Sequence, residues 1–231
     1  MKPLTLTGKA KAVETGPDNP NHHVLRLVDP AAFARGEAGP RDAILVTARD
    51  APGAAAVAKF AVFVGDRLDG WKPAASISLG DEFGYLAPGD IIGAHLDTGR
   101  VRTLYRRSSR HNSFLTTERC NHYCLMCSPP PKEVNDGWLL DEIAEALPLI
   151  DPATPYIGFT GGEPLLEWRR IIELLALARE TLPRTAIHLL TNGRGFADPQ
   201  IADAWAAVAH PDLCAGIPIY AAIDSVHDYV V

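Results

Sequence analysis

The sequence has 231 residues, of which 47% are apolar, enough for the core of one large domain or two modest ones. A formal net charge of -6 argues against a protein that binds nucleic acids nonspecifically. No run of about 18 apolar residues occurs, and the polar segment after Met1-Lys2-Pro3 lacks the apolar core of a signal peptide. We therefore expect a cytoplasmic protein without membrane or nucleic-acid partners.

Charge is distributed unevenly along the chain. Residues 1–110 contain 15 Lys+Arg and 12 Asp+Glu, whereas residues 111–231 contain 7 and 16. This shift predicts an N-terminal domain at residues 1–110 and a second domain at residues 111–231. A basic run before the boundary indicates a solvated strand and linker, which we favour, or a site for an acidic peptide. The run consists of Arg100, Arg102, Arg106, Arg107 and Arg110.

Short apolar runs separated by turn signals predict a β-rich N-terminal domain, either a small barrel or a sandwich. The expected strands are Leu4–Thr7, Val24–Val28, Ala43–Val46, Phe60–Val64, Ile91–Leu96 and Val101–Tyr105. Asp97-Thr98-Gly99 fits a hairpin loop between the last two strands, and the alanine-rich stretch Ala51–Lys59 fits a short helix. His22-His23 suggests a metal pair, but adjacent residues point to opposite sides of a strand. We therefore expect an exposed loop pair there.

From residue 113 the pattern changes to alternating strands and helices. Strands are predicted at Ser113–Thr117, Tyr156–Phe159, Ala186–Leu190 and Ala215–Ala222, and helices at Trp138–Leu149, Leu165–Leu182 and Ile201–Ala209. Asp136 is the expected cap of the first helix, and Asp198 or Pro199 lies near the start of the third. This alternation predicts the α/β class, with parallel strands and right-handed crossovers. Ligands of such sheets gather at the carboxyl ends of the strands.

Three of the four cysteines lie within eight residues. Cys120, Cys124 and Cys127 have the spacing C-x3-C-x2-C, just after the first predicted strand. Thiolates this close together suit soft metals, either iron in a cubane cluster or zinc. Three protein ligands leave one iron of a four-iron cluster open, whereas a structural zinc site needs a fourth ligand. The candidates for that fourth ligand are His122, His111 and Cys214. No second C-x2-C pair occurs, which favours the iron cluster.

Distinctive motifs also follow the other three predicted strands. Gly161-Gly162-Glu163-Pro164 lets a small zwitterion approach the backbone, with Glu163 as a candidate partner for an ammonium group. An ordinary strand-to-helix turn has the same composition. Thr191-Asn192-Gly193 follows the third strand, and Asp224-Ser225-Val226-His227-Asp228 follows the fourth. Cys214 lies at the start of the fourth strand, where we expect a buried core residue rather than a radical relay or a ligand of a second cluster.

Together these motifs resemble the radical SAM (S-adenosylmethionine) superfamily over residues 111–231. The resemblance implies that the three clustered cysteines hold a [4Fe-4S] cluster whose open iron binds SAM. Family cores are (β/α)6 partial barrels. Only about four strands are predicted here, so we expect the N-terminal portion of the barrel in a truncated product. An adenine-contacting segment after a fifth strand has no counterpart.

The same resemblance assigns cofactor-binding residues at each strand end. It places Gly161, Gly162 and Glu163 beside the amino group of SAM. Met126 stands where the family often has an aromatic residue near the adenine, and a thioether also packs against a ring. The remaining candidates are Asn192 after the third strand and Asp224 or Ser225 after the fourth. No side chain is assigned a catalytic role.

The segment from Leu115 to Pro130, the terminal His227–Val231 and the preceding β-rich domain resemble the HxsC maturases of the His-Xaa-Ser system. This implies a ribosomally made peptide with His-Xaa-Ser repeats as substrate. A second radical SAM maturase and an electron donor are the implied partners. In such enzymes the reduced cluster cleaves SAM to a 5′-deoxyadenosyl radical, which takes a hydrogen atom from the substrate. The alternatives are a zinc-stabilised binding module and a catalytically inactive partner that presents a leader peptide.

Overall fold

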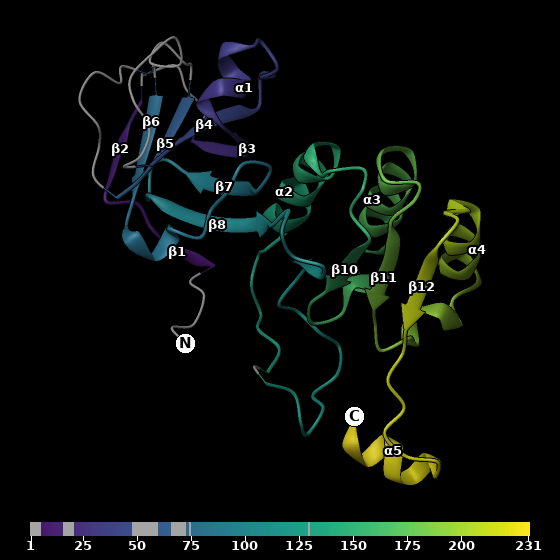
Figure 1. The fold of residues 1–231 in the computed structure, drawn as a ribbon. Helices are drawn as coiled ribbons and strands as arrows, with labels where there is room; N and C mark the ends of the chain where they lie inside the picture. The colour runs from purple at the N-terminus through teal and green to yellow at the C-terminus, as the bar shows by residue number, and fades with distance from the viewer. Residues whose placement is uncertain (1–5, 16–20, 48–59, 66–72, 74, 129) are drawn as a thin grey trace. The chain divides into compact units, whose positions relative to one another are not determined.

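The computed structural model describes residues 6–15, 21–47, 60–65, 73, 75–128 and 130–231 (Figure 1). The chain divides into two compact units, Met1–Ser109 and Arg110–Val231. Within the described ranges no helix is both long enough and apolar enough to cross a membrane. The predicted helix Ala51–Lys59 and most of the predicted strand Leu4–Thr7 lie outside the described residues.

The first unit is built on one eight-stranded mixed sheet, with strand order β1-β8-β7-β3-β4-β5-β6-β2. The strands are β1 (Thr7–Lys9), β2 (Ala12–Glu14), β3 (His22–Val28), β4 (Asp42–Val46), β5 (Phe60–Val64), β6 (Ala75–Leu79), β7 (Ile91–His95) and β8 (Arg100–Tyr105). A short helix, α1 (Pro30–Ala34), follows β3, and the 3-10 turn η2 (Asp81–Phe83) follows β6. The prediction of a β-rich unit is confirmed.

The two outermost strands of this sheet are consecutive in sequence. β1 and β2 lie at opposite ends of the strand order, yet only Ala10 and Lys11 separate them. The N–H of Ala10 donates to the Gly99 carbonyl between β7 and β8, and the N–H of Lys11 donates to the Ser78 carbonyl on β6, each at 2.7 Å. The sheet therefore curls until its two edges meet at this segment, as in a small barrel.

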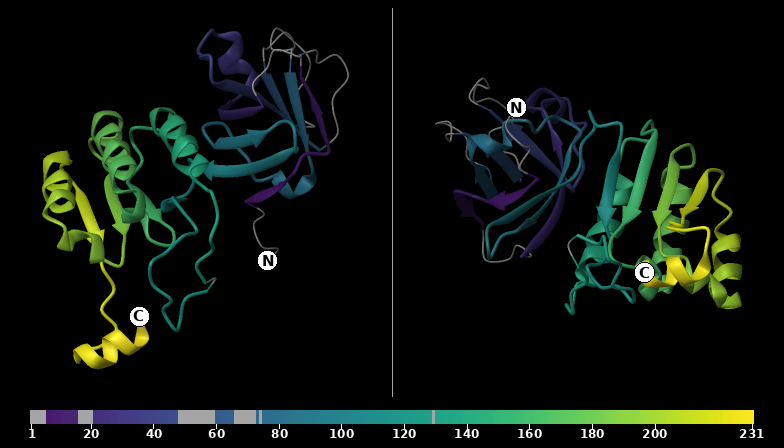
Figure 2. Two further views of the ribbon diagram at one scale, coloured as in Figure 1. Left: turned by 180° about the vertical axis from the view of Figure 1, so that it is seen from behind. Right: turned by 90° about the horizontal axis from the view of Figure 1, so that it is seen from below.

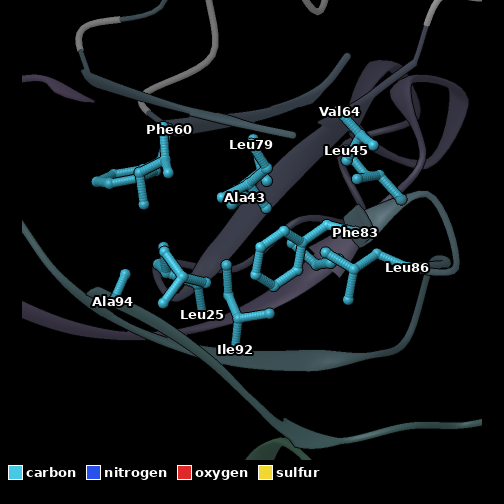
Figure 3. Packing of buried hydrophobic residues seen from close by; sticks show 14 of the residues in the cluster. Leu25, Ala43, Leu45, Phe60, Val64, Leu79, Phe83, Leu86, Ile92 and Ala94 are labelled. Carbon is cyan, nitrogen blue, oxygen red and sulfur yellow. The ribbon is translucent and has the colours of Figure 1, made fainter. Parts of the chain in front are cut away.

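Apolar side chains fill the interior of the curled sheet. Among them are Leu25, Leu45, Leu79, Phe83 and Ile92, all buried (Figure 3). Each such side chain contributes about 1.5–3 kcal/mol when it leaves water. A smaller cluster covers the outer face of β4 and β5, where Phe33 of α1 packs. All five residues of β5 are therefore buried, as expected for a strand covered on both faces.

His22 and His23 lie within β3 and are half-buried, so the expected exposed loop pair is wrong. Their rings do point to different neighbours. The His22 ring centre lies 4.5 Å from that of His95, and the His23 ring centre lies 5.1 Å from that of Phe60. The predicted hairpin at Asp97-Thr98-Gly99 is confirmed, because β7 and β8 pair antiparallel on either side of it.

The second unit contains a four-stranded parallel sheet in the order β12-β11-β10-β9. Its strands are β9 (Asn112–Leu115), β10 (Tyr156–Thr160), β11 (Ala186–Leu190) and β12 (Leu213–Gly216). The helices are α2 (Trp138–Ala146), α3 (Trp168–Thr181), α4 (Pro199–Val208) and α5 (Asp224–Val230). Helices α2, α3 and α4 lie side by side along the sheet (Figures 1 and 2), as consecutive right-handed crossovers require.

Three assignments predicted for this unit need correction. Asp136 does not cap α2: the cap is Gly137, and no side chain bonds there. The helix expected at Leu165–Leu182 is the 3-10 turn η4 (Pro164–Glu167) followed by α3, which leaves Leu166 exposed. The strand expected at Ala215–Ala222 is β12, which ends at Gly216. Pro218 has no N–H to donate to a ladder, which disfavours continuation of the strand. The segment Asp224–Asp228 is helical, within α5.

Candidate functional site

The loops that leave the carboxyl ends of the four parallel strands surround one pocket of about 830 Å³. Figure 1 shows the chain after β9 and the helix α5 beyond these strand ends. The lining includes Leu115, Thr117, Glu118, Cys120, His122, Cys124, Met126, Cys127, Gly161, Gly162, Leu190, Thr191, Asn192, Gly216, Ile217 and Tyr220. The motifs predicted after the first three strands are thus brought together, as the strand-end rule for parallel sheets requires.

The residues Cys120–Cys127, here called the cysteine loop, present all three clustered thiols to this pocket. None of these thiols is in a disulfide. The loop turns tightly at its end, where the N–H of Cys127 donates to the Cys124 carbonyl at 2.9 Å. Burial raises the pKa of the Cys120 thiol, while the N–H of His122 acts in the opposite direction. This environment favours the neutral thiol until a cation draws the sulfur into a thiolate bond.

Gly161 and Gly162 lie against the chain that leads into the cysteine loop. A Cβ on Gly161 would lie 2.5 Å from the Thr117 carbonyl oxygen, and one on Gly162 would lie 2.0 Å from that of Arg119. The N–H of Gly162 donates to Thr117 and the N–H of Glu163 donates to Arg119, each at 2.8 Å. Glycine is therefore required here so that two strand-end loops can pack backbone to backbone.

The Glu163 carboxylate is 1% exposed and is bonded to the protein itself. Its Oε1 accepts from the N–H of Leu165 at 2.8 Å and from the hydroxyl of Thr191 at 2.7 Å. Its Oε2 accepts from the N–H of Asn192 at 2.7 Å. The carboxylate therefore ties the exit loop of β10 to the exit loop of β11. These bonds indicate a structural role for Glu163 rather than the expected pairing with an ammonium group.

Asn192 extends this network to the cysteine loop. Its side-chain amide donates to the side-chain oxygen of Asn121 at 2.7 Å, and its own side-chain oxygen accepts from the N–H of Arg194 at 3.0 Å. A chain of hydrogen bonds thus runs from Glu163 through Asn192 to Asn121, next to the first thiol. Three loops around the pocket are connected by these contacts alone.

Met126 and Asp224 have different positions relative to the pocket. Met126 lines it with a half-exposed side chain. Asp224 is not among the lining residues; it begins α5, and its carboxylate accepts from the N–H of Ser225 at 2.8 Å. Because β12 ends at Gly216, the residues that follow it and line the pocket include Ile217 and Tyr220 rather than Asp224.

Cys214 is exposed on β12, so its predicted burial in the core is wrong. The other suggested zinc ligands also separate. His111 precedes β9, at the amino end of the sheet, and its ring packs edge-on against Tyr156. His122 alone of the three lines the pocket, and its buried Nδ1 has no hydrogen-bond partner among the described residues. The cysteine loop therefore offers three thiols and one imidazole.

Sequence reasoning missed the apolar part of the lining. Leu115, Leu190, Ile217 and Tyr220 all line the pocket and are partly exposed. Leu115 and Leu190 are the last residues of their strands. An apolar residue at the final position of a parallel strand, next to a motif loop, would have signalled a pocket wall.

The residues present fit a soft metal centre. Three free thiols from one loop face one pocket, and thiolate sulfur is the ligand that iron–sulfur clusters and zinc prefer. The pocket is large enough for a small organic molecule beside the metal, because such sites typically measure about 300–1,000 Å³.

Comparison with known proteins agrees with this donor set. Residues 114–213 match the radical SAM superfamily. A GTP 3′,8-cyclase of Mycobacterium marinum is 37% identical over 120 residues, which are 48% of this chain and 30% of that protein. A GTP 3′,8-cyclase of Mycolicibacterium smegmatis is 35% identical over 135 residues, 54% of this chain and 34% of that protein. The chain thus spans about a third of the length of these curated relatives.

Proposed function

Because residues 114–213 match the radical SAM superfamily, we propose that this chain belongs to an enzyme that cleaves SAM at the pocket described above. The radical SAM family implies a [4Fe-4S] cluster and SAM as cofactors. The observation that carries the proposal is the position of the three free thiols beside the Gly161–Pro164 loop, in one pocket at the carboxyl ends of parallel strands.

The cluster would be held by Cys120, Cys124 and Cys127. When bound, the cluster supplies one electron for cleavage of a carbon–sulfur bond in SAM, and the organic chemistry belongs to these cofactors. The remaining role of the chain is to bind and orient. Gly161, Gly162 and Asn192 offer backbone and amide groups at one side of the pocket, and Met126 offers a polarizable thioether.

The apolar wall of the pocket would limit the access of water. Leu115, Leu190, Ile217 and Tyr220 line the pocket at the strand ends. Exclusion of water would strengthen the electrostatic interactions in the site and would limit side reactions of bound cofactors. We place Glu163 behind this surface, as the residue that fixes the loops rather than one that contacts the cofactor.

We further propose that the four-stranded sheet is the N-terminal portion of a (β/α)6 partial barrel. The support is the sequential parallel order β9, β10, β11, β12 with one helix after each of the first three strands. Leu213–Gly216 is the outermost of these strands and pairs only with β11 among the described strands.

For the substrate, we propose a ribosomally made peptide with His-Xaa-Ser repeats. The support is the resemblance of Leu115–Pro130 and His227–Val231 to HxsC maturases, together with a β-rich unit that precedes the radical SAM domain. A second radical SAM maturase and an electron donor would be the partners. The alternatives are a zinc-stabilised binding module, which metal analysis tests, and a catalytically inactive peptide-binding partner, which the SAM cleavage assay tests.

A second candidate substrate is a purine nucleotide. The curated relatives are GTP 3′,8-cyclases, and their identity of 35–37% extends over about half of this chain. That match covers about a third of each relative, so it supports shared SAM chemistry more strongly than a shared substrate.

Substrate-dependent formation of 5′-deoxyadenosine separates these proposals. The reconstituted chain is incubated with SAM and a reductant, and then either a His-Xaa-Ser repeat peptide or GTP is added. When the peptide is added, we expect 5′-deoxyadenosine to form faster than without it and the mass of the peptide to change. Acceleration by GTP alone would overturn the peptide proposal, and zinc binding without 5′-deoxyadenosine would overturn the enzyme proposal. Inactivation of a variant that lacks Cys120 serves as the control.

A further inference from the structure

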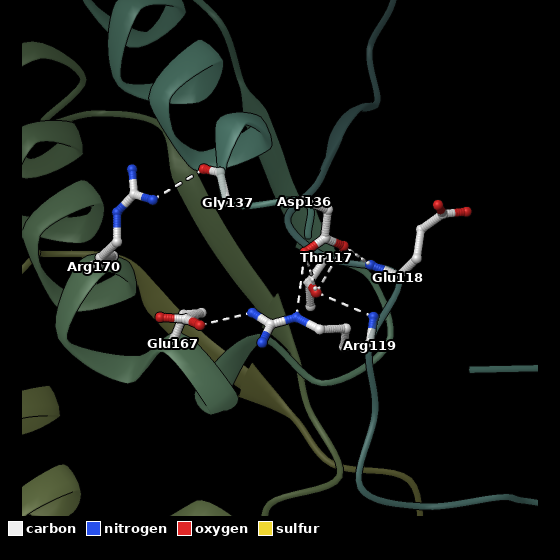
Figure 4. Close-up of polar contacts among 7 residues, drawn as sticks. All are labelled: Thr117, Glu118, Arg119, Asp136, Gly137, Glu167 and Arg170. Atoms are coloured by element: carbon white, nitrogen blue, oxygen red, sulfur yellow. Dashed lines mark hydrogen bonds and ion pairs between the residues drawn. The ribbon is translucent and has the colours of Figure 1, made fainter. Parts of the chain in front are cut away.

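The residues just before the cysteine loop meet a buried carboxylate that the proposed chemistry does not use. Asp136, next to the start of α2, is 4% exposed. It contacts Thr117, Glu118 and Arg119, the three residues that precede Cys120 (Figure 4). We call Asp136 with these three residues and Glu167 the Asp136 cluster.

Asp136 accepts three kinds of hydrogen bond from this segment. The Thr117 hydroxyl donates its one hydrogen in a bifurcated bond to the two carboxylate oxygens, at 3.1 and 3.0 Å. The N–H of Glu118 donates at 2.6 Å, and the Arg119 guanidinium donates at 3.3 Å. A buried carboxylate that lost these donors would be costly to leave unpaired. The segment is therefore held at successive residues.

The threonine hydroxyl has two roles in this cluster. While it donates to Asp136, its oxygen accepts from the N–H of Arg119 at 3.1 Å. Arg119 then reaches Glu167 at the start of α3, where the guanidinium donates at 2.6 Å. The backbone that leads into Cys120 is thus fixed from the α2 side and from the α3 side. The Gly162 and Glu163 N–H groups bond the carbonyls of the same segment.

We infer that the Asp136 cluster positions the cysteine loop for metal binding. Thr117, Arg119 and Asp136 act as positioning residues, because none is itself a thiol ligand. The inference depends on the proposed function only for the identity of the metal centre. Preorganisation of a ligand's surroundings typically changes metal affinity by about 10–100-fold, and here it acts through the backbone before the first ligand.

A matched pair of variants tests this inference. Thr117→Val keeps the shape of the side chain but removes both hydrogen bonds of the hydroxyl, whereas Thr117→Ser keeps the hydroxyl. Each is reconstituted with iron and sulfide, and the rate of iron loss to a chelator is measured. We expect loss about tenfold faster in Thr117→Val and at the wild-type rate in Thr117→Ser.

Arg170→Gln is the neighbouring control. Arg170 lies on α3 and donates to the Gly137 carbonyl at 2.9 Å and to the Asp141 carboxylate, and these bonds do not involve the Asp136 cluster (Figure 4). We expect its rate of iron loss to equal that of the wild type. Equal rates of iron loss in Thr117→Val and Thr117→Ser would overturn the inference, because the hydroxyl would then have no effect. Iron loss accelerated equally in Arg170→Gln would also overturn it, because general loosening of the helices would then be the cause.

A second measurement uses protein without an iron–sulfur cluster. In metal-free protein that carries Cys214→Ala, we expect Thr117→Val to change the reaction rate of the cysteine-loop thiols with a disulfide reagent, and Thr117→Ser to leave it unchanged. If Thr117→Val folds poorly, Glu167→Gln replaces it, since the Arg119–Glu167 pair is partly exposed and contributes little to stability. Unchanged thiol rates in both variants would overturn the inference. Failure of the wild type to take up iron would instead contradict the proposed function.

Discussion

The two units of the chain bury polar side chains in different ways. Among the described residues, the first unit buries Ser76 and Asp90, whereas the second buries Asn112, Thr116, Thr117, Asp136, Glu142, Thr154, Glu163, Thr185, Thr191 and His210. Buried polar groups are costly unless they are hydrogen-bonded. A unit that keeps many of them uses them to fix particular loops.

The partners show which loops are fixed. In the first unit Asp90 accepts from the N–H groups of Ala87 and Arg107, at 3.0 and 2.8 Å, and so connects the chain on either side of β7 and β8. In the second unit Thr117, Asp136, Glu163 and Thr191 all serve the loops around the pocket. Some are merely structural, such as Thr185, which donates to the Thr154 carbonyl away from the pocket. Buried polar residues lie at both ends of the second sheet. Those at the carboxyl ends, which include Thr117, Glu163 and Thr191, hold the loops that surround the candidate site.

Loss of the cysteine-loop thiols is expected to have the largest effect. Replacement of Cys120, Cys124 or Cys127 by alanine should reduce cluster iron from about four atoms per chain to near zero, because a cubane held by two thiolates is poorly retained. Cys214→Ala is the control, since this exposed thiol lies outside the pocket lining. Iron analysis after anaerobic reconstitution makes the measurement. Equal loss of iron in Cys214→Ala would contradict the assignment of ligands.

Glu163→Gln is expected to have the next largest effect. The amide nitrogen must face at least one of the donors that now point at the carboxylate, so we expect a loss of about 3 kcal/mol in the free energy of unfolding. Chemical denaturation followed by circular dichroism measures it. Glu173→Gln removes the same charge from the exposed face of α3 and should change stability by less than about 0.5 kcal/mol. Similar losses in both variants would show that Glu163 has no special structural role.

Gly162→Ala tests the backbone contact between the two loops. Its Cβ would lie 2.0 Å from the Arg119 carbonyl oxygen, and overpacking of this kind costs about 1–3 kcal/mol. Gly137→Ala is the matched control, because the nearest atom to its Cβ is Arg170 Nη1 at 3.5 Å. We expect Gly162→Ala to lower both the unfolding midpoint and iron retention, and Gly137→Ala to leave retention unchanged. An alanine tolerated at residue 162 would contradict the close packing.

The smallest effect is expected in the first unit and depends on pH. Burial raises the pKa of Asp90, although the N–H groups of Arg107 and Ala87 oppose the shift. The carboxyl group of Asp90 therefore binds a proton more tightly in the folded state than in the unfolded state. The free energy of unfolding that this protonation contributes is lost as pH rises through the folded pKa. The stability difference between wild type and Asp90→Asn, about 1 kcal/mol, should shrink as pH rises through that window. A stability difference that grew with pH would contradict the predicted direction. Altered iron retention in Asp90→Asn would contradict the contrast between the two units.

Much of the second unit could be predicted because its signals are local. The apolar runs predicted β10 and β11, and the rule on carboxyl strand ends predicted that the cysteines, Gly161–Pro164 and Asn192 would meet. One structural assignment failed because it depends on tertiary neighbours. Asp136 has the composition of a helix cap, but Thr117 and Glu118 provide better donors. Gly161 and Gly162 line the pocket, and they also pack against the backbone of Thr117–Arg119, a contact that the sequence did not predict.

The first unit was harder to delineate from the sequence. The strands β2 and β6 were missed because Ala12–Glu14 is only three residues long and Ala75–Leu79 alternates small and apolar residues without strong β-formers at every position. The helix α1 was also missed, although Asp29 followed by Pro30 is a typical start signal, and Asp29 does accept from the N–H of Ala32 at 2.6 Å. The meeting of β1 and β2 across the curled sheet follows from long-range pairing that no local pattern encodes.

The most direct test of the central claim is the stoichiometry and chemistry of the reconstituted metal centre. The purified chain is loaded anaerobically with iron and sulfide, its metal content is counted, and SAM is added with a reductant. The account predicts about four irons per chain, a brown chromophore and 5′-deoxyadenosine as a product. One zinc per chain, with no iron uptake and no 5′-deoxyadenosine, would contradict it.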